Sequence, residues 1–193
     1  MALRRDMLYP EQKKTLWQRL GRCYPTPLEL VPLLLLGLTI YLVLSNYSTL
    51  PDTIPTHFNA QGVADDWGSK NTILLFPAIA FPIYIFLSLL TGWMSVVKDP
   101  KSLINLPDQT KAAITEARAE ELRVFIERCL FLMKTLTVGL MTYSVYATSE
   151  VARGEAKNLG AAFYLILAAI LVCTALMVWR SLGLVLSERK QSQ

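Results

Sequence analysis

The sequence is short of charge and almost free of histidine. Only 18% of its 193 residues are charged, 53% are hydrophobic, and the single histidine is His57. A soluble domain usually carries about 25% charged residues, and a disordered chain is highly charged and poor in apolar residues. The composition therefore excludes a disordered chain and argues against an ordinary water-soluble globule.

The chain also lacks the short motifs that mark common enzymes. No G-x-S-x-G, H-E-x-x-H, Walker or G-x-G-x-x-G pattern occurs, and one histidine with scattered aspartates falls short of a catalytic set. The three cysteines, Cys23, Cys129 and Cys173, form no C-x-x-C pair. We therefore expect a protein that is not an enzyme, with no cofactor, no bound metal and no disulfide framework.

What the sequence has instead is apolar length. Three uncharged segments span 30–49, 71–97 and 158–179, and a fourth, 129–149, is interrupted only by Lys134. Each reaches the roughly 20 residues that a helix needs to cross a bilayer. Backbone amides in lipid must pair within their own segment, so these segments are expected to be helices. The predicted fold is an all-α integral membrane protein with four transmembrane helices.

Lys134 is the one charge inside a predicted span. An ionisable group at such a position is a functional candidate. Lys134 follows Cys129 by five residues, and a lysine stem can reach the headgroups from that depth. We therefore expect its ammonium to extend back to the cytoplasmic headgroups.

Basic residues are unevenly shared between the segments that flank the spans. Six precede the first span and six lie between the second and third, against one and two in the other two loops. Lysine and arginine concentrate in cytoplasmic loops. The predicted location is the bacterial plasma (inner) membrane, with both termini in the cytoplasm. The net charge of +4 then reflects topology, and no nucleic-acid partner is expected.

This topology divides the chain into five parts. They are a cytoplasmic basic leader (1–27), a two-span domain (28–97) with an outside loop (50–70), a cytoplasmic hinge with an amphipathic helix (98–128), spans three and four (129–180) and a cytoplasmic tail (181–193). The leader is predicted either to lie as a short helix on the headgroups or to be a solvated tail.

The segment before the third span is predicted to be an amphipathic helix that continues into that span. Asp108 is a suitable N-cap for a helix that begins at Gln109. Ile114, Leu122 and Phe125 recur at helical spacing between charged positions. This apolar stripe packs against the leader or the membrane surface, or it faces a cytosolic partner. We weigh the first interpretation more heavily.

The outside loop is the most distinctive stretch of the chain, with the sequence LPDTIPTHFNAQGVADDWGSK. Two prolines stiffen its first part, and Asn59–Gly62 and Asp65–Gly68 are typical of turns. The loop is therefore predicted to be a small folded lid between spans one and two.

Polar and aromatic side chains of this lid are candidates for ligand recognition. We expect His57 to hydrogen-bond a backbone carbonyl or an aspartate within the lid, and Lys70 to pair with Asp65 or Asp66. The candidate ligand-binding residues are His57, Phe58, Asn59, Asp65, Trp67 and Lys70.

The lid and its two spans resemble a widespread bacterial membrane domain of unknown function, which also forms the N-terminal part of sporulation-delay toxin immunity proteins. The residues that carry the resemblance are Leu50-Pro51, Ile54-Pro55, His57-Phe58-Asn59, Gly62 and Asp65 to Trp67-Gly68-Ser69-Lys70. The resemblance implies a multi-span protein that protects against a secreted toxin and can hold a cytosolic repressor at the membrane.

Two functions agree with these observations. In the first, the lid binds an extracytoplasmic peptide or toxin, and the cytoplasmic helix captures a cytosolic regulator. In the second, the chain is a small accessory subunit of a larger membrane complex. The small residues Thr135, Gly139, Ala169 and Cys173 allow close helix contacts, and we favour contacts within the bundle. Membrane lipid is an expected partner in both cases.

Overall fold

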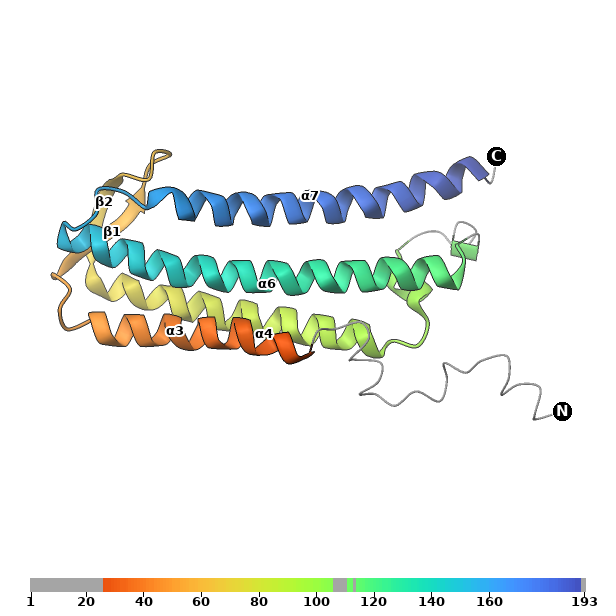
Figure 1. Cartoon of the computed structure of the whole chain (residues 1–193), viewed down its shortest axis with the longest axis horizontal. Coiled ribbons are helices and arrows are strands. Elements are labelled where there is room, and N and C mark those ends of the chain that lie inside the picture. Colours follow the sequence, from red (N-terminus) through yellow and green to blue (C-terminus); the bar gives the residue numbers. More distant parts are fainter. Residues whose placement is uncertain (1–25, 106–110, 113, 192–193) are drawn as a thin grey trace.

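The computed structural model describes residues 26–105, 111–112 and 114–191. Most of this part is helical, and its long helices lie side by side (Figure 1). They are α3 (Leu30–Asn46), α4 (Leu75–Val96), α6 (Glu116–Arg153) and α7 (Gly160–Gln191). The predicted helical membrane fold is thus found, together with one element that the all-α class does not include, a two-stranded sheet. The predicted leader (1–27) lies almost wholly outside the described residues.

Short 3-10 helices join the long helices. They are η2 (Thr26–Glu29) before α3, η3 (Lys70–Leu74) before α4, and η4 (Pro100–Leu103) between α4 and α6. The hydroxyl of Ser69 accepts a hydrogen bond from the backbone amide of Asn71 at 3.3 Å. This side-chain cap fixes the direction in which the chain leaves the sheet.

Three described helical stretches are long and apolar enough to cross a membrane, namely Pro27–Asn46, Lys70–Val96 and Gly160–Gly183. Few of the residues in their most apolar parts are buried by the rest of the protein: 22% in the first stretch, 11% in the second and 6% in the third. Apolar helices that remain this exposed are typical of chains solvated by lipid. The chain is therefore a membrane protein. The predicted fourth span, 129–149, lies within α6, which is less apolar than the others.

α6 is the central helix of the bundle. It packs against α3, α4 and α7, and at one end against the hairpin. Midway along the bundle Val138 of α6 meets Leu36 of α3 and Ala80 of α4 in a buried cluster. A second apolar cluster lies beneath the hairpin and contains Val43, Leu50, Ile54, Ile73 and Val145.

α6 begins later than the sequence predicts. The expected cap Asp108 and helix start Gln109 lie outside the described residues, but Ile114 already precedes the helix. Thr115 has an extended backbone and its hydroxyl accepts a hydrogen bond from the amide of Arg118 at 3.3 Å. A continuous helix from Gln109 is therefore wrong, because Thr115 interrupts the helix and caps the next one.

The small residues of the predicted spans pack within the bundle. A side chain at Gly139 would lie 3.7 Å from Leu35 of α3, and the thiol of Cys173 lies 3.7 Å from the carbonyl oxygen of Cys129 on α6. These contacts support the interpretation that small residues bring helices of the same chain together.

The loop between α3 and α4 is folded, as the sequence predicts, but it is a two-stranded hairpin, which the sequence does not predict. The turn expected at Asp65–Gly68 is wrong, because these residues belong to the second strand. Strands β1 (Thr53–Phe58) and β2 (Ala64–Ser69) pair antiparallel, with an irregularity in register on either side of His57. In the turn, the side-chain oxygen of Asn59 accepts hydrogen bonds from the amides of Gln61 and Val63, each at 3.0 Å. Gly62 has φ +74, a conformation that favours glycine. We call residues 50–70, the segment predicted above to be a lid, the cap.

Candidate functional site

The inner side of the cap is sealed against one end of the bundle. Ile54 of β1 and Leu50 are buried on Ile73 and on Val145 of α6. The alternation expected of a strand over a core is not kept in β1, where the neighbours Ile54 and Pro55 are both buried and Thr56 and His57 are both exposed. The pairing register of the hairpin is irregular from Pro55 to Phe58. The cap is therefore a fixed element of the fold.

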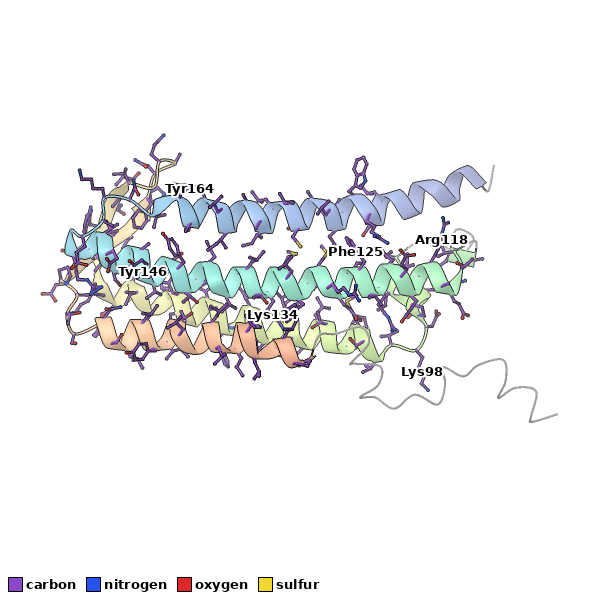
Figure 2. All side chains as sticks on the ribbon, in the orientation of Figure 1. Lys98, Arg118, Phe125, Lys134, Tyr146 and Tyr164 are labelled. Atoms are coloured by element: carbon purple, nitrogen blue, oxygen red, sulfur yellow. The ribbon has the colours of Figure 1, made fainter. Side chains whose placement is uncertain are left out.

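The tip of the cap is also fastened to the start of α7. The amide of Leu159 donates to the carbonyl of Gly62 at 2.9 Å, and the hydroxyl of Tyr164 donates to the carbonyl of Ala60 at 3.1 Å. Tyr143 of α6 donates in turn to the carbonyl of Leu159 at 2.8 Å. Figure 2 shows Tyr164 reaching this end of the molecule from α7. These tyrosines could not be identified from their local sequence, because their partners are backbone carbonyls in other segments of the chain.

The structure brings two of the predicted ligand-binding residues together. The Nδ1 atom of His57 lies 2.5 Å from a carboxylate oxygen of Asp65, and both side chains are exposed. The expected hydrogen bond of His57 within the lid is thus confirmed. Trp67 lies on the neighbouring strand with half of its surface exposed. These three side chains remain available to a ligand.

The other candidate ligand-binding residues, Phe58, Asn59 and Lys70, make contacts within the cap. Asn59 closes the turn, and Phe58 is half-buried opposite Ala64. Lys70 pairs with Asp52 at 3.0 Å, so its predicted pairing with Asp65 or Asp66 is wrong. The cause is the backbone: the amide of Lys70 donates to the carbonyl of Asp52 at 2.9 Å, which places the two side chains together.

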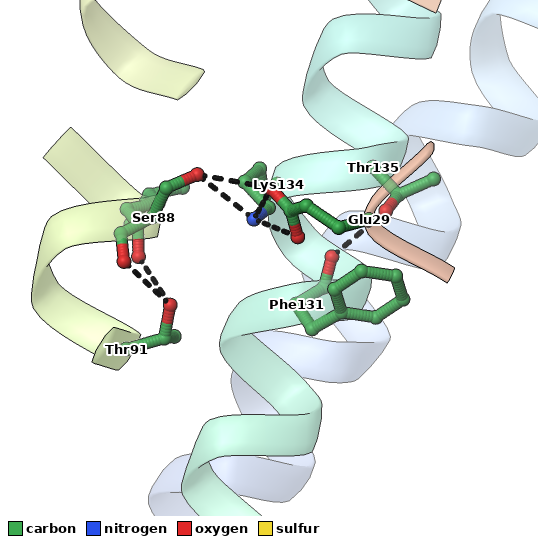
Figure 3. A network of polar contacts seen from close by, with 7 residues as sticks. Glu29, Ser88, Thr91, Phe131, Lys134 and Thr135 are labelled. Carbon is green, nitrogen blue, oxygen red and sulfur yellow. Dashed lines mark hydrogen bonds and ion pairs between the residues drawn. The ribbon is translucent and has the colours of Figure 1, made fainter. Parts of the chain in front are cut away.

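A buried ion pair lies inside the bundle. The ammonium of Lys134 donates to both carboxylate oxygens of Glu29, at 2.6 and 2.7 Å, and to the hydroxyl of Ser88 at 3.0 Å (Figure 3). Lys134 is fully buried. The prediction that it extends to the headgroups is therefore wrong. An oppositely charged partner at hydrogen-bond distance stabilises the ammonium more than a long reach to the surface.

This ion pair joins three helices. Glu29 ends η2 at the start of α3, Ser88 lies on α4, and Lys134 lies on α6. The rings of Tyr84 and Phe131 lie 5.3 and 5.5 Å from the ammonium, at the distance of cation–π contacts. Lys134 could be singled out from the sequence, but Glu29 could not, because it stands at the edge of the first apolar run.

Two further charged residues are buried closer to the start of α6. Arg123 donates to the carbonyls of Val97 and Met94 at 2.8 and 3.3 Å, and to Glu120 at 2.5 Å. Neither carboxylate oxygen of Glu127, which is fully buried, has a hydrogen-bond partner in the described part of the chain. Glu127 precedes the expected span 129–149. Burial raises its pKa to about 7, against the opposing effect of the positive Arg123.

The buried charged residues of α6 follow one face. Arg123, Glu127 and Lys134 are spaced by four and seven residues, which places them in line along a helix. The hydroxyls of Thr142 and Thr39 lie 2.8 Å apart and extend the polar contacts to α3. A line of polar groups therefore runs through the middle of an otherwise apolar bundle.

A groove opens between α6 and α7 at the end away from the cap. It has a volume of about 530 Å³, and Leu122 and Phe125 line it. Ile114, the third predicted partner-facing residue, is fully buried instead. The guanidinium of Arg180 on α7 pairs with Glu121 and lies 4.7 Å from the ring centroid of Phe125. The predicted apolar stripe is thus divided between the core and this groove.

No metal site is apparent in the part of the chain that the structure describes, where no three histidine, cysteine, aspartate or glutamate side chains come together. The described cysteines, Cys129 and Cys173, are free thiols.

Comparison with known proteins matches part of the chain. A family model described as a domain of unknown function (DUF1648) matches residues 34–81, which include most of α3, the cap and the start of α4. A protein of Archaeoglobus fulgidus, named "Uncharacterized protein", is 29% identical over 151 residues, which cover 75% of this chain and 80% of that protein. No solved structure matches. Neither match carries a function.

Proposed function

We propose that the chain is a four-span, non-enzymatic protein of the plasma membrane whose cap binds an extracytoplasmic peptide. The observation that carries this proposal is a hairpin sealed below by the bundle and held at its tip by α7, with polar and aromatic side chains exposed. A rigid surface loses little conformational entropy when it binds a ligand. This favours recognition as the role of the cap.

The fourth span of this proposal is the part of α6 between residues 129 and 149. α6 lies alongside the apolar helices for most of its length (Figure 1). The pairing of Lys134 with Glu29 lowers the free-energy cost of a charge at membrane depth. A span here carries the chain back across the membrane, so that α7 starts on the cap side.

The orientation of the proposed topology follows from the basic residues. The end away from the cap carries more basic residues, among them Lys98, Lys101, Arg118, Arg123 and Arg180, whereas the cap end carries Lys70, Arg153 and Lys157. Since basic residues favour the cytoplasmic side, the cap faces outward and both termini lie in the cytoplasm.

The chemistry of the cap favours a peptide with a cationic segment. Asp65 and Asp66 are exposed, Lys70 neutralises only Asp52, and Trp67 presents its ring beside them. Carboxylates bind lysine and arginine side chains, and an indole ring attracts the same cations. The ligand class that the sequence resemblance implies is a secreted peptide toxin.

α6 offers a route by which binding outside is reported inside. It contacts β1 of the cap at one end and η4 and the α6–α7 groove at the other. In this proposal, a ligand on the cap changes the packing of α6, and a cytosolic regulator responds to that change.

The test is a growth assay. A toxin-sensitive bacterium that makes this chain is challenged with purified sporulation-delay toxin, and the variants D65N/W67A and Q61A are compared at equal membrane levels. Gln61 is exposed on the same hairpin and serves as the matched control. We expect protection by the original chain and by Q61A, and loss of protection in D65N/W67A. Absence of protection by the original chain contradicts the immunity role.

A second candidate role is that of an accessory subunit in a larger membrane complex. It is favoured by α7, which packs on α6 along one side and exposes Leu165, Leu171 and Val172. Native electrophoresis of membranes in mild detergent distinguishes the two roles. Migration in a large defined assembly supports the accessory role, and migration alone or as a small homo-oligomer supports a cap that acts independently.

A further inference from the structure

The groove between α6 and α7 combines cationic side chains with an apolar wall. Its volume of about 530 Å³ is within the range of small-ligand sites. The residues that line it include the cationic side chains of Arg118 and Arg180, and Glu121, which pairs with Arg180. We propose that this groove binds the headgroup of an anionic glycerophospholipid.

Arg180 is already oriented for such a ligand. Its guanidinium is held from one side by Glu121 and lies over the ring of Phe125 at 4.7 Å. About half of the Arg180 side chain remains exposed. A planar guanidinium held in this way binds phosphate oxygens with little further loss of side-chain entropy.

The depth of the lining residues follows the order of groups in a phospholipid. The apolar stretch of α7 ends at Gly183, so Arg180 lies in its last turn and Leu176 about one turn deeper. Trp179, between them, is 79% exposed, and tryptophan is enriched at this level of a membrane. In this arrangement the phosphate of the lipid lies at the level of Arg180, its glycerol at the level of Trp179 and the start of its acyl chain at the level of Leu176.

This order favours a lipid over a soluble anion. Leu176 and Trp179 line the groove and also belong to the stretch of α7 that is long and apolar enough to cross the membrane. An occupant therefore needs an apolar part at membrane depth, and inorganic phosphate has none. Basic pockets between membrane helices are known to bind anionic headgroups.

The experiment titrates the full chain in neutral detergent with phosphatidylglycerol or phosphatidylcholine and counts bound lipid by native mass spectrometry. We expect preferential binding of phosphatidylglycerol and a roughly 30-fold weaker affinity in R118Q/R180Q, from about 1 kcal/mol per basic residue. The matched control K98Q/K101Q removes the same charge at the same end, outside the groove lining, and should bind as the original chain does.

A second variant tests the groove without changing its charge. A side chain at Gly183 meets no atom within 4 Å, so G183L extends into open space and should weaken phosphatidylglycerol binding with both arginines present. Unchanged binding in either R118Q/R180Q or G183L overturns the proposal. Full displacement of the lipid by an equal concentration of soluble glycerol phosphate also overturns it. None of these outcomes depends on the cap or its ligand.

Discussion

α6 and α7 are neighbouring helices of similar length, but α6 is largely covered by the rest of the protein and α7 is largely uncovered. α6 carries charged and hydroxyl side chains and buries many of them, including Lys134 and Glu127. α7 is almost wholly apolar up to Gly183 and leaves most of that surface uncovered. In a water-soluble protein the polar helix would be the exposed one. The contrast shows that this bundle is arranged for lipid, with its polar groups directed to the inside.

The contrast predicts that the largest loss of stability follows from a substitution in the ion pair between Lys134 of α6 and Glu29. K134M removes the ammonium that lies 2.6 and 2.7 Å from the carboxylate oxygens of Glu29, and breaking a buried pair costs about 3–5 kcal/mol of the free energy of unfolding. Denaturant or thermal unfolding in micelles measures this loss. The double variant E29Q/K134M should regain most of it, because neither charge is then left alone. A K134M variant as stable as the original chain would show that Lys134 reaches the headgroups after all.

The second effect concerns Glu127 and depends on pH. Its pKa is raised to about 7 from a usual value of 4.5, so the folded state holds the proton more tightly than the unfolded state. The contribution of Glu127 to the free energy of unfolding should therefore be fully present below pH 4.5 and be lost as the pH rises through about 7. E127Q should flatten this decrease and stabilise the protein above pH 7 by up to about 3 kcal/mol.

The measurement is a series of unfolding curves for the original chain and E127Q from below pH 4.5 to above pH 7. Arg123 and Glu120 are the charged neighbours that shift this pKa, in opposite directions. E120Q is therefore a useful control, because it keeps the buried carboxylate of Glu127. An identical pH dependence in E127Q would contradict the assignment.

The third effect concerns the end of α7 near the cap, where hydrogen bonds join the helix to the hairpin. Gly62 has φ +74, and a Cβ there would lie 2.7 Å from the hydroxyl of Tyr164. G62A should therefore cost about 1–3 kcal/mol and speed hydrogen exchange at the amide of Leu159, which donates to Gly62. G92A is the control, since a Cβ at Gly92 meets nothing within 4 Å. Equal exchange in both variants would show that the tip is not fastened.

The smallest effect is expected on the exposed side of α7. L171A removes a side chain that lipid contacts in place of protein, so its change in unfolding free energy should be close to zero. L130A removes a buried side chain of α6 and leaves a cavity, which should cost about 2 kcal/mol. Equal losses in the two variants would remove the distinction between a covered and an uncovered helix.

The apolar runs and the turn of the cap could be predicted because they depend on local sequence. Uncharged length indicated the membrane helices, and Asn59 and Gly62 indicated the hairpin turn. The partners of Lys134 and Lys70 could not be predicted correctly. Each depends on where another segment lies in space, the end of η2 in one case and the residue before β1 in the other.

The start of α6 and the groove between α6 and α7 were difficult to predict from the sequence for a different reason. Thr115 is as suitable an N-cap as Asp108, and periodicity alone does not decide between them. Leu122 and Phe125 could be recognised as one apolar stripe, but the cations that complete the groove come partly from α7, more than fifty residues later.

The central claim is that α6 crosses the membrane, and labelling of single cysteines tests it most directly. In a variant without Cys23, Cys129 and Cys173, a cysteine is placed at Lys98, in the connection between α4 and α6, or at Glu155, just after α6; both positions are exposed. A membrane-impermeant maleimide applied to intact cells should label the cysteine at Glu155 and spare the one at Lys98 until the cells are permeabilised. If both positions are labelled from the same side, α6 does not span the membrane and the four-span account is contradicted.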